Sequence, residues 1–264
     1  MDDEVEVLHG GVANAGAVVR AGDHVLRPGN EHSDSILRFL AELRTTGFAG
    51  APAPVGRESD GRERLTFIPG QVAIPPYPDW VQTDAALASI TRLLRSFHDA
   101  ARQVDTTTMS WSAEMVDPQG GVLVCHNDVC LENVVFRDGH AVALLDFDFA
   151  APGRAAYDVA AFARMCVPID DDVNPAKLGW HPNDRPRRLR LVCDTYGLDT
   201  AGRAEVLACL DGAIERGGEF VRRHVEAGEP GFVTMWEEMG GMERFDRRRA
   251  WWADSREEFA AALA

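Results

Sequence analysis

Three polar side chains in the middle of the chain have types and a spacing that suit metal-assisted phosphate chemistry. Asp128 and Asn133 lie in one polar stretch, and Asp146 follows thirteen positions after Asn133. Magnesium prefers oxygen ligands and is often held by one or two carboxylates together with substrate phosphates. Asn133 and Asp146 are therefore candidate ligands for a metal-nucleotide complex, and Asp128 is free to act as a base.

The apolar runs around these residues predict how they are brought together. Residues 122–125 form a buried-strand pattern, and the runs 134–136 and 141–145 are joined by the turn pair Asp138-Gly139. Two short strands joined by Asp-Gly form a hairpin. Such a hairpin places Asn133, just before its first strand, beside Asp146, just after its second.

This pattern, His-x-Asp-x-x-x-x-Asn followed by a strand-terminal Asp, resembles the catalytic core of the aminoglycoside phosphotransferase family, relatives of the protein kinases. The loop after Asp146 and the helix that begins near Tyr157 are also similar to that family, and the resemblance extends more loosely from about Leu8 to Phe162. The chain departs from the family pattern at Asn127 and Asp148, where glycine is common.

The resemblance implies an α+β, protein-kinase-like fold with two lobes. Residues 1–70 would form a small antiparallel sheet that binds the nucleotide, and residues 71–264 would form a mainly helical lobe for catalysis and acceptor binding. Strands followed by helices along the chain agree with this division. The implied enzyme is a small-molecule kinase that uses ATP and Mg²⁺ to phosphorylate a hydroxyl group, with an aminoglycoside-type antibiotic as the favoured acceptor.

The resemblance also gives roles to individual residues. Asp128 would orient the acceptor hydroxyl and take its proton, while Asn133 and Asp146 would hold the metal. His126 would hydrogen-bond the backbone near Asp146, and Asp158 would brace the catalytic loop. The residue Asp148 remains a candidate for contact with metal or substrate.

The N-terminal part should contain three short strands, 5–8, 17–20 and 24–27, followed by a helix from Ser33 to Gly47 and a sheet-edge strand at 65–68. Gly11 lies in a glycine-rich turn whose backbone amides could approach phosphate. The family has a lysine on its third strand, whereas the only lysine here is Lys177. Arg27 takes that place, and its guanidinium could bind phosphate; Asp34 and Glu42 are both open as its acidic partner.

Residues that enter the second lobe are expected near the nucleotide base. Phe67, Ile68 and Gly70 correspond to the family's hinge, and the proline-rich stretch 71–80 would be the linker. Helical patterns then follow at 83–104, 157–166, 187–196, 201–227, 234–239 and in a final helix through Trp251 to Leu263.

Composition narrows the class of partner. The chain of 264 residues has a formal net charge of −15 and no clear basic cluster, so a nucleic-acid partner is not expected and a cationic small molecule is favoured. The start lacks signal-peptide features, and no apolar run is long enough to span a membrane, which predicts a cytoplasmic protein. Five cysteines without a Cys-x-x-Cys pair argue against a disulfide framework or structural zinc site. Oligomeric state is left open.

Other interpretations of the same residues remain. The acceptor could instead be of macrolide, choline, homoserine or sugar type. The missing lysine favours a non-catalytic nucleotide-binding or immunity protein on the same scaffold. His98-Asp99 together with His126 and Asp128 suggests a metal-dependent phosphohydrolase, and the acidic run 170–172 suggests either a solvated loop or a contact for a cationic substrate.

Overall fold

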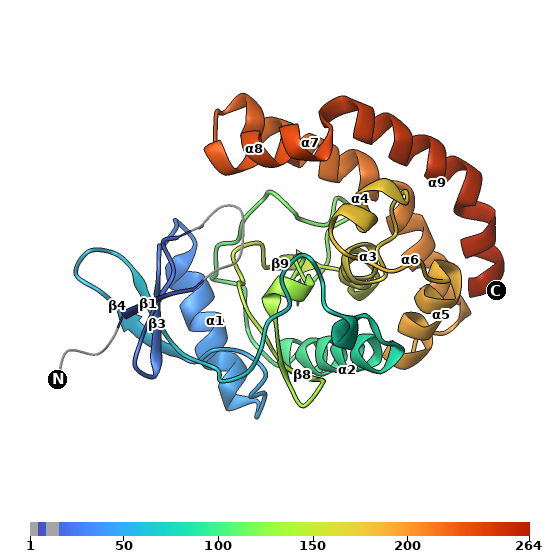
Figure 1. The fold of residues 1–264 in the computed structure, drawn as a ribbon. Coiled ribbons are helices and arrows are strands. Elements are labelled where there is room, and N and C mark those ends of the chain that lie inside the picture. The colour runs from blue at the N-terminus through green and yellow to red at the C-terminus, as the bar shows by residue number, and fades with distance from the viewer. Residues whose placement is uncertain (1–4, 9–15) are drawn as a thin grey trace.

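The structure is a computed structural model that describes residues 5–8 and 16–264. A small sheet with one helix forms one side of the molecule, and helices make up most of the rest (Figure 1). The predicted α+β architecture, a small antiparallel sheet followed by a mainly helical part, is confirmed. The proposed lobe boundary at residue 70 falls between the sheet, which ends at Thr66, and the first long helix of the second part, which begins at Asp84.

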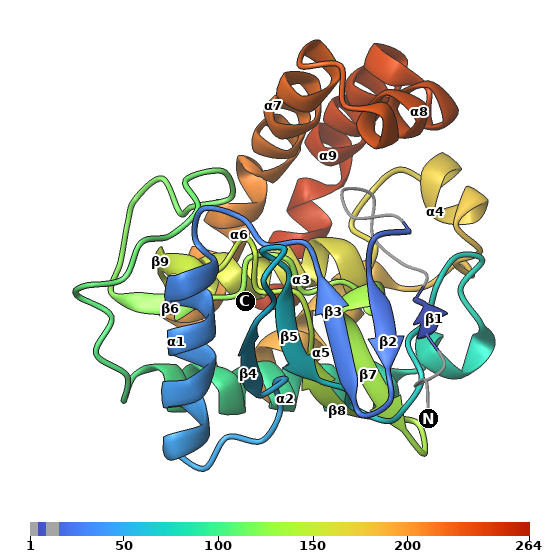
Figure 2. The ribbon, with the colours of Figure 1, turned by 90° about the vertical axis from the view of Figure 1, so that its left-hand side faces the viewer.

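The N-terminal sheet is antiparallel with the strand order β1-β2-β3-β5-β4 (Figure 2). Its strands are β1 (Val5–Val7), β2 (Val19–Ala21), β3 (His24–Arg27), β4 (Pro54–Arg57) and β5 (Glu63–Thr66). The expectation that the strand around Leu65 is an edge is wrong, because β5 lies between β3 and β4. Strand β4 takes the edge, and its Pro54 and Gly56 are tolerated there because an edge strand has fewer ladder hydrogen bonds to lose.

Helix α1 (Ser33–Thr45) forms as its spacing predicts. Its buried side chains recur at helical intervals: Ile36, Phe39, Leu40 and Leu43. The helix packs beside β4, with which it makes direct contacts (Figure 2).

The second part contains short strands and a larger set of helices, and residues 126–133, the predicted catalytic loop, follow the first of these strands. The strands are β6 (Leu123–Cys125), β7 (Val134–Arg137), β8 (His140–Leu144) and β9 (Ala151–Gly153). The helices are α2 (Asp84–Ala101), α3 (Ala155–Cys166), α4 (Val173–Lys177), α5 (Arg185–Tyr196), α6 (Thr200–Asp211), α7 (Ala213–Glu226), α8 (Pro230–Met239) and α9 (Gly241–Leu263), with 3-10 turns at Asp79–Gln82 and Leu131–Asn133.

Two details of the helical part differ from the prediction. The single helix expected over 201–227 is two helices, α6 and α7, which meet at Gly212. The loop expected over 167–185 contains the short helix α4. Helices α7 and α8 project from the body of the molecule, and α9 returns along α5 and α6 to the C-terminus (Figures 1 and 2).

An aromatic core lies directly beneath the catalytic loop. Phe97 of α2 is fully buried, and its ring centroid is 6.2 Å from that of Phe39 and 5.6 Å from that of Phe147. The His126 ring lies 4.6 Å from Phe147. The loop that carries Asp128 therefore rests on close-packed side chains from both parts of the molecule. Among the described residues, no helix is both long and apolar enough to cross a membrane.

Candidate active site

The predicted hairpin brings Asp128, Asn133 and Asp146 to one place. Strands β7 and β8 pair antiparallel, and the Leu145 amide donates to the Asn133 carbonyl oxygen at 2.8 Å. The Asn133 side-chain Nδ2 donates to Asp128 at two atoms, the backbone oxygen at 3.0 Å and Oδ2 at 2.9 Å. Asn133 thus fixes the Asp128 carboxylate through its amide nitrogen, which leaves its own carbonyl oxygen for another partner.

Asp158 braces the catalytic loop, as the resemblance implied. It accepts the backbone N–H of His126 on Oδ2 at 2.7 Å and that of Asn127 on Oδ1 at 2.8 Å. Although burial raises the pKa of Asp158, its hydrogen bond with His98 and these backbone amides outweigh burial and lower it. The predicted role of His126 is also confirmed, because its Nε2 lies 2.9 Å from the Leu145 carbonyl oxygen.

The departure from glycine at Asn127 has a conformational explanation. Asn127 has φ of 64°, in the left-handed region that glycine occupies freely. Asparagine is one of the few other residues that tolerate this region. Its side chain also donates to the Phe149 carbonyl oxygen at 2.9 Å, which ties the catalytic loop to the loop after Asp146.

Arg27 is buried and joins three carboxylates. Its Nε donates to Glu63 Oε2 at 2.6 Å, its Nη1 to Asp146 Oδ1 at 2.9 Å, and its Nη2 to Asp148 Oδ1. Neither of the expected partners on α1 takes part. Asp34 pairs instead with Arg57 at 3.0 Å, and Glu63 reaches Arg27 because β3 and β5 pair in the register Arg27↔Glu63.

The pKa values of two carboxylates of the site are raised by burial. Burial, reinforced by the charge of Asp146, raises the pKa of Asp128 to about 7. Burial also raises the pKa of Asp148 to about 6, although Arg27 opposes the shift. For Arg27, burial acts to lower the pKa, but the charges of Asp146, Asp148 and Glu63 raise it overall.

The oxygen donors fit the magnesium ion that the fold family implies. Hydrogen bonding leaves the carbonyl oxygen of Asn133 available, and the contact of Asp146 with Arg27 uses only Oδ1. Carboxylate and amide oxygens of this kind are typical magnesium ligands. Among residues 5–8 and 16–264, Arg27 uses three of its five N–H donors, on Glu63, Asp146 and Asp148, and the other two could reach a phosphate group.

The residues expected near the nucleotide base lie where the sheet leads into the second part. Phe67 lies against Arg20, whose guanidinium carbon is 3.9 Å from the ring centroid. Ile68 follows it and is partly exposed. Gly70 has φ of 156°, and a Cβ there would come within 2.6 Å of the Phe136 carbonyl oxygen, so close approach to β7 requires glycine. Gly11 lies outside the described residues.

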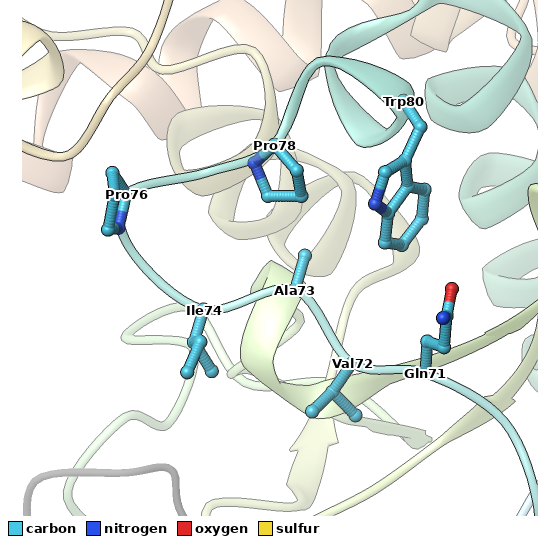
Figure 3. A pocket seen from close by; sticks show the side chains of 7 residues that line it. All are labelled: Gln71, Val72, Ala73, Ile74, Pro76, Pro78 and Trp80. Carbon is cyan, nitrogen blue, oxygen red and sulfur yellow. The ribbon is translucent and has the colours of Figure 1, made fainter.

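The linker is attached to the hairpin and forms one wall of a depression. Gln71 and Phe136 exchange backbone hydrogen bonds of 2.9 and 2.7 Å. A hollow of about 400 Å³ opens along the predicted linker, as Figure 3 shows, and its lining residues are Gln71, Val72, Ala73, Ile74, Pro76, Pro78 and Trp80. None of the residues that line this hollow belongs to the loop that carries Asp128.

The alternative metal site at His98 is occupied by protein contacts. His98, Cys125 and Asp158 bring possible ligand atoms within 4.8 Å of one another, and all three are buried. Both ring nitrogens of His98 already have partners, Tyr196 Oη at 2.6 Å and Asp158 Oδ2 at 2.9 Å. Since Asp128 is not part of this group, the geometry favours a packed structural histidine over a phosphohydrolase centre.

The acidic run after α3 is divided, because Asp170 and Asp171 are buried in ion pairs whereas Asp172 is exposed. Asp170 and Asp171 are 8% and 6% exposed and pair with arginines of α9. Asp172 pairs with Arg185 at 2.7 Å. Sequence reasoning missed these arginines because helical periodicity does not say which side chain of a distant helix will meet the loop.

With this geometry in place, the chain can be compared with known proteins. Residues 100–191, which include the catalytic loop and the hairpin, match the sequence model of the phosphotransferase enzyme family. The chain has the kinase-like fold of this family. It resembles a choline/ethanolamine kinase family protein from Mesorhizobium loti, with a TM-score of 0.64 and 17% identity. The match covers 98% of this chain and 92% of that one.

Two further relatives widen the range of activities associated with this fold. The ternary complex of streptomycin and ATP with APH(2")-IIa has a TM-score of 0.56 and 14% identity, over 92% of this chain and 93% of the other. The trifolitoxin immunity protein of Rhizobium leguminosarum bv. trifolii is 29% identical over 277 residues, covering both chains completely. The match to the phosphotransferase family model thus agrees with the resemblance that the motif indicated. The immunity protein is similar to the chain over its whole length.

Proposed function

We propose that this chain transfers the γ-phosphoryl group of ATP to a hydroxyl group of a small molecule. The observation that carries the proposal is the convergence of Asp128, Asn133 and Asp146, held by the Asn133–Asp128 hydrogen bond of 2.9 Å and by the Leu145–Asn133 backbone bond. Phosphoryl transfer depends mainly on positioning and on charge neutralisation, and this arrangement suits both requirements.

Each residue has a role that follows from its contacts. Asp128 accepts the proton of the acceptor hydroxyl, and Asn133 holds the Asp128 carboxylate in place. Asn133 and Asp146 supply oxygens to Mg²⁺, which when bound would neutralise negative charge on the phosphate oxygens. Arg27 directs its remaining N–H groups to phosphate in place of a lysine. Gly11, Phe67, Ile68 and Gly70 are the proposed contacts of the nucleotide, within a lobe formed by residues 1–70.

The acceptor lobe is formed by residues 71–264 in this proposal. The kinship of the fold with APH(2")-IIa, which was solved with streptomycin, makes aminoglycosides reasonable first acceptors to test, and the choline/ethanolamine kinase relative adds amino alcohols. The charge of −15 also supports a cationic acceptor at the level of the whole chain.

A second candidate is a kinase-like protein that binds nucleotide or confers immunity without catalysis. Two observations favour it. The relative with full-length similarity is named an immunity protein. In addition, the Arg27 guanidinium already pairs with Asp146, the proposed metal ligand, and with Asp148.

A mass-spectrometric screen distinguishes the two candidates. The protein would be incubated with ATP and Mg²⁺ and with aminoglycosides, macrolides, choline, homoserine and sugars, and each compound would be examined for a gain of one phosphoryl group. A gain that is absent with Asp128→Asn supports the kinase. If ATP binds but no compound gains a phosphoryl group, the non-catalytic candidate is favoured instead.

A further inference from the structure

The predicted linker carries a tyrosine whose hydroxyl contacts the catalytic loop. Tyr77 Oη donates a hydrogen bond of 2.8 Å to Glu132 Oε1, across 55 positions of the chain. Glu132 immediately precedes Asn133, the residue that holds the Asp128 carboxylate. Tyr77 is buried, and burial together with the charge of Glu132 raises the pKa of its hydroxyl. The hydroxyl therefore stays protonated and acts as the donor in this contact.

The position of the Tyr77 ring is fixed from two directions. The Tyr77 backbone N–H donates to the Leu178 carbonyl oxygen at 2.9 Å. The side-chain nitrogen of Gln82 donates to the carbonyl oxygens of both Tyr77 and Gly179, each at 2.8 Å. The Tyr77 ring packs against Trp180, with 5.0 Å between the ring centroids. Because the linker and the loop after α4 both hold this residue, its hydroxyl has a defined place beside the catalytic loop.

Glu132, in contrast, lies in a short turn that depends on outside contacts. It is the middle residue of the 3-10 turn Leu131–Asn133, and the hydrogen bonds of such turns have poorer geometry than those of an α-helix. The buried Leu131 fixes the start of the turn. In the described part of the chain, the Glu132 carboxylate accepts a hydrogen bond from Tyr77 alone, and its Oε2 is buried without a partner. The Tyr77 hydroxyl is therefore the contact that fixes the middle of the turn.

A displacement of this turn would disturb two functions of Asn133 at once. Its Nδ2 donates to the backbone oxygen and to Oδ2 of Asp128, and its carbonyl oxygen is the proposed ligand of the metal. Both atoms belong to one planar amide, so a shift of the backbone at Glu132 moves the base and the metal ligand together. Misplacement of a catalytic group by about 1 Å can cost about 10²-fold in rate.

We propose that Tyr77 is a positioning residue, which acts through Glu132 to place Asn133 for metal binding and for alignment of Asp128. The inference rests on the proposed phosphotransferase function and adds to it a residue outside the catalytic motif. The linker would then do more than connect two parts of the chain. It already contacts the hairpin through the backbone hydrogen bonds of Gln71, and Tyr77 provides a second contact just before β7.

The variant Tyr77→Phe tests the inference because it removes the hydroxyl and keeps the ring. Mn²⁺ replaces Mg²⁺ as the probe, since both prefer oxygen ligands, and electron paramagnetic resonance measures the free Mn²⁺ in the presence of a saturating nonhydrolysable ATP analogue. The loss of one positioning hydrogen bond should raise the Kd for Mn²⁺ roughly 3- to 10-fold. In the transfer reaction at saturating Mg²⁺, kcat should fall while the KM for ATP stays close to the native value.

Conservative variants of the partner show whether the hydrogen bond itself matters. Glu132→Ala lacks the acceptor and should weaken Mn²⁺ binding as much as Tyr77→Phe. Glu132→Gln keeps an oxygen for the Tyr77 hydroxyl and should recover most of the affinity. The matched control is Tyr157→Phe, another buried tyrosine, whose ring lies 5.3 Å from the guanidinium carbon of Arg216 on α7. It should bind Mn²⁺ like the native protein, and circular dichroism and thermal unfolding check that all variants are folded.

A double-mutant cycle separates positioning from a general loss of stability. If Tyr77 acts through Asn133, then Tyr77→Phe should add nothing to the loss of Mn²⁺ affinity caused by Asn133→Ala. Independent structural effects of the two substitutions would instead add.

The outcomes distinguish this inference from the proposed function. Native Mn²⁺ affinity in Tyr77→Phe, an equal loss in Tyr157→Phe or Glu132→Gln, or additive losses in the cycle would each overturn the inference, even if the native protein phosphorylates an acceptor. Absence of Mn²⁺ binding by the native protein would overturn it as well. Weakened Mn²⁺ binding in Tyr77→Phe, without phosphorylation of any compound by the native protein, leaves the positioning of the metal ligand standing and favours the non-catalytic candidate.

Discussion

Arg27 Nη1 donates a hydrogen bond of 2.9 Å to Asp146 Oδ1, across 119 positions of the chain. This contact joins strand β3 of the sheet to the residue that follows β8, so the proposed phosphate-binding cation and the proposed metal ligand are already partners. The arrangement is compact because the same guanidinium also binds Glu63 and Asp148. Mutation of Arg27 and Asp146 can separate the effect of this contact on nucleotide binding from its effect on metal binding.

The variant Arg27→Gln should lose nucleotide affinity if Arg27 replaces the lysine of related kinases. One or two charge-assisted hydrogen bonds to phosphate are removed, which corresponds to roughly a 10- to 100-fold rise in Kd. Calorimetric titration with ATP and Mg²⁺ measures this Kd. Arg27→Lys should recover part of the affinity, since it keeps the charge but not the fork.

Arg62→Gln is the control for this experiment, because Arg62 is partly exposed between β4 and β5 of the same sheet and, within the described part of the chain, forms its ion pair with Asp60 alone, at 2.8 Å. It should bind ATP like the native protein. Unchanged ATP affinity in Arg27→Gln would show that Arg27 is a structural counter-ion and would remove it from the proposed nucleotide site.

Magnesium should have a different effect on the stability of Arg27→Gln than on that of the native protein. Removing the guanidinium leaves the carboxylates of Glu63, Asp146 and Asp148 without their common partner, and breaking a buried pair costs about 3–5 kcal/mol. A divalent cation can take its place. We therefore expect a lower Tm in the variant and a rise on addition of Mg²⁺ that exceeds the rise in the native protein, measured without nucleotide.

The double variant Arg27→Gln, Asp146→Asn supplies the control for the magnesium effect. If Asp146 is a metal ligand, the additional substitution should abolish most of the stabilisation by Mg²⁺. A rise in Tm that persists in the double variant would place the metal elsewhere.

The variant Asp128→Asn should lower the rate of phosphoryl transfer by roughly 10²- to 10⁴-fold, because a positioned base is lost. Nucleotide affinity should change little, since Asn133 can still donate to the side-chain oxygen of the new asparagine. Single-turnover kinetics with ATP and the acceptor found in the screen measures the rate. Asp138→Asn, in the exposed turn of the same hairpin, should keep the native rate, and an equally active Asp128→Asn would exclude Asp128 as the base.

The parts of the site that the sequence predicted depend on local geometry. Asn133 and Asp146 meet because a short hairpin lies between them, and His126 reaches Leu145 within the same unit. Local spacing of this kind determines the result almost independently of the rest of the fold. The positive φ of Asn127 likewise follows from the loop and explains why asparagine can stand where glycine is usual.

The parts that the sequence did not predict depend on the register and packing of distant elements. Glu63, not Asp34 or Glu42, became the partner of Arg27 because β5 lies beside β3, and β5 was expected at the edge of the sheet. The ion pairs of Arg244 and Arg248 with Asp170 need α9 to return across the molecule to the loop after α3. No pattern along the chain carries that information, because the sequence of α9 does not say which distant loop its arginines will meet.

His126 should contribute a loss of stability as the pH drops below neutrality, and this loss opposes the gain from Asp128 and Asp148, whose folded pKa values are raised to about 7 and about 6. Burial lowers the pKa of His126 in the folded protein below its value of 6.5 in the unfolded chain. At this residue the unfolded state therefore binds more protons below about pH 6.5, and the contribution of His126 to the free energy of unfolding decreases as pH falls from there towards the folded pKa. Asp158, whose folded pKa is also lowered, adds a second loss only below its unfolded value of 3.8.

Urea unfolding of native protein and of His126→Asn, between about pH 7 and pH 5, measures the contribution of His126 to stability. This pH range lies above the range in which Asp158 contributes. The variant is expected to be less stable at neutral pH, because the contact between His126 Nε2 and the Leu145 carbonyl oxygen is weakened or lost. The difference in free energy of unfolding between the native protein and the variant should nevertheless shrink as the pH falls over this range, since the variant lacks the buried histidine whose protonation destabilises the native protein. His140→Asn, at an exposed position on β8, should keep the native slope. An identical slope in His126→Asn and the native protein would assign the pH dependence to another group.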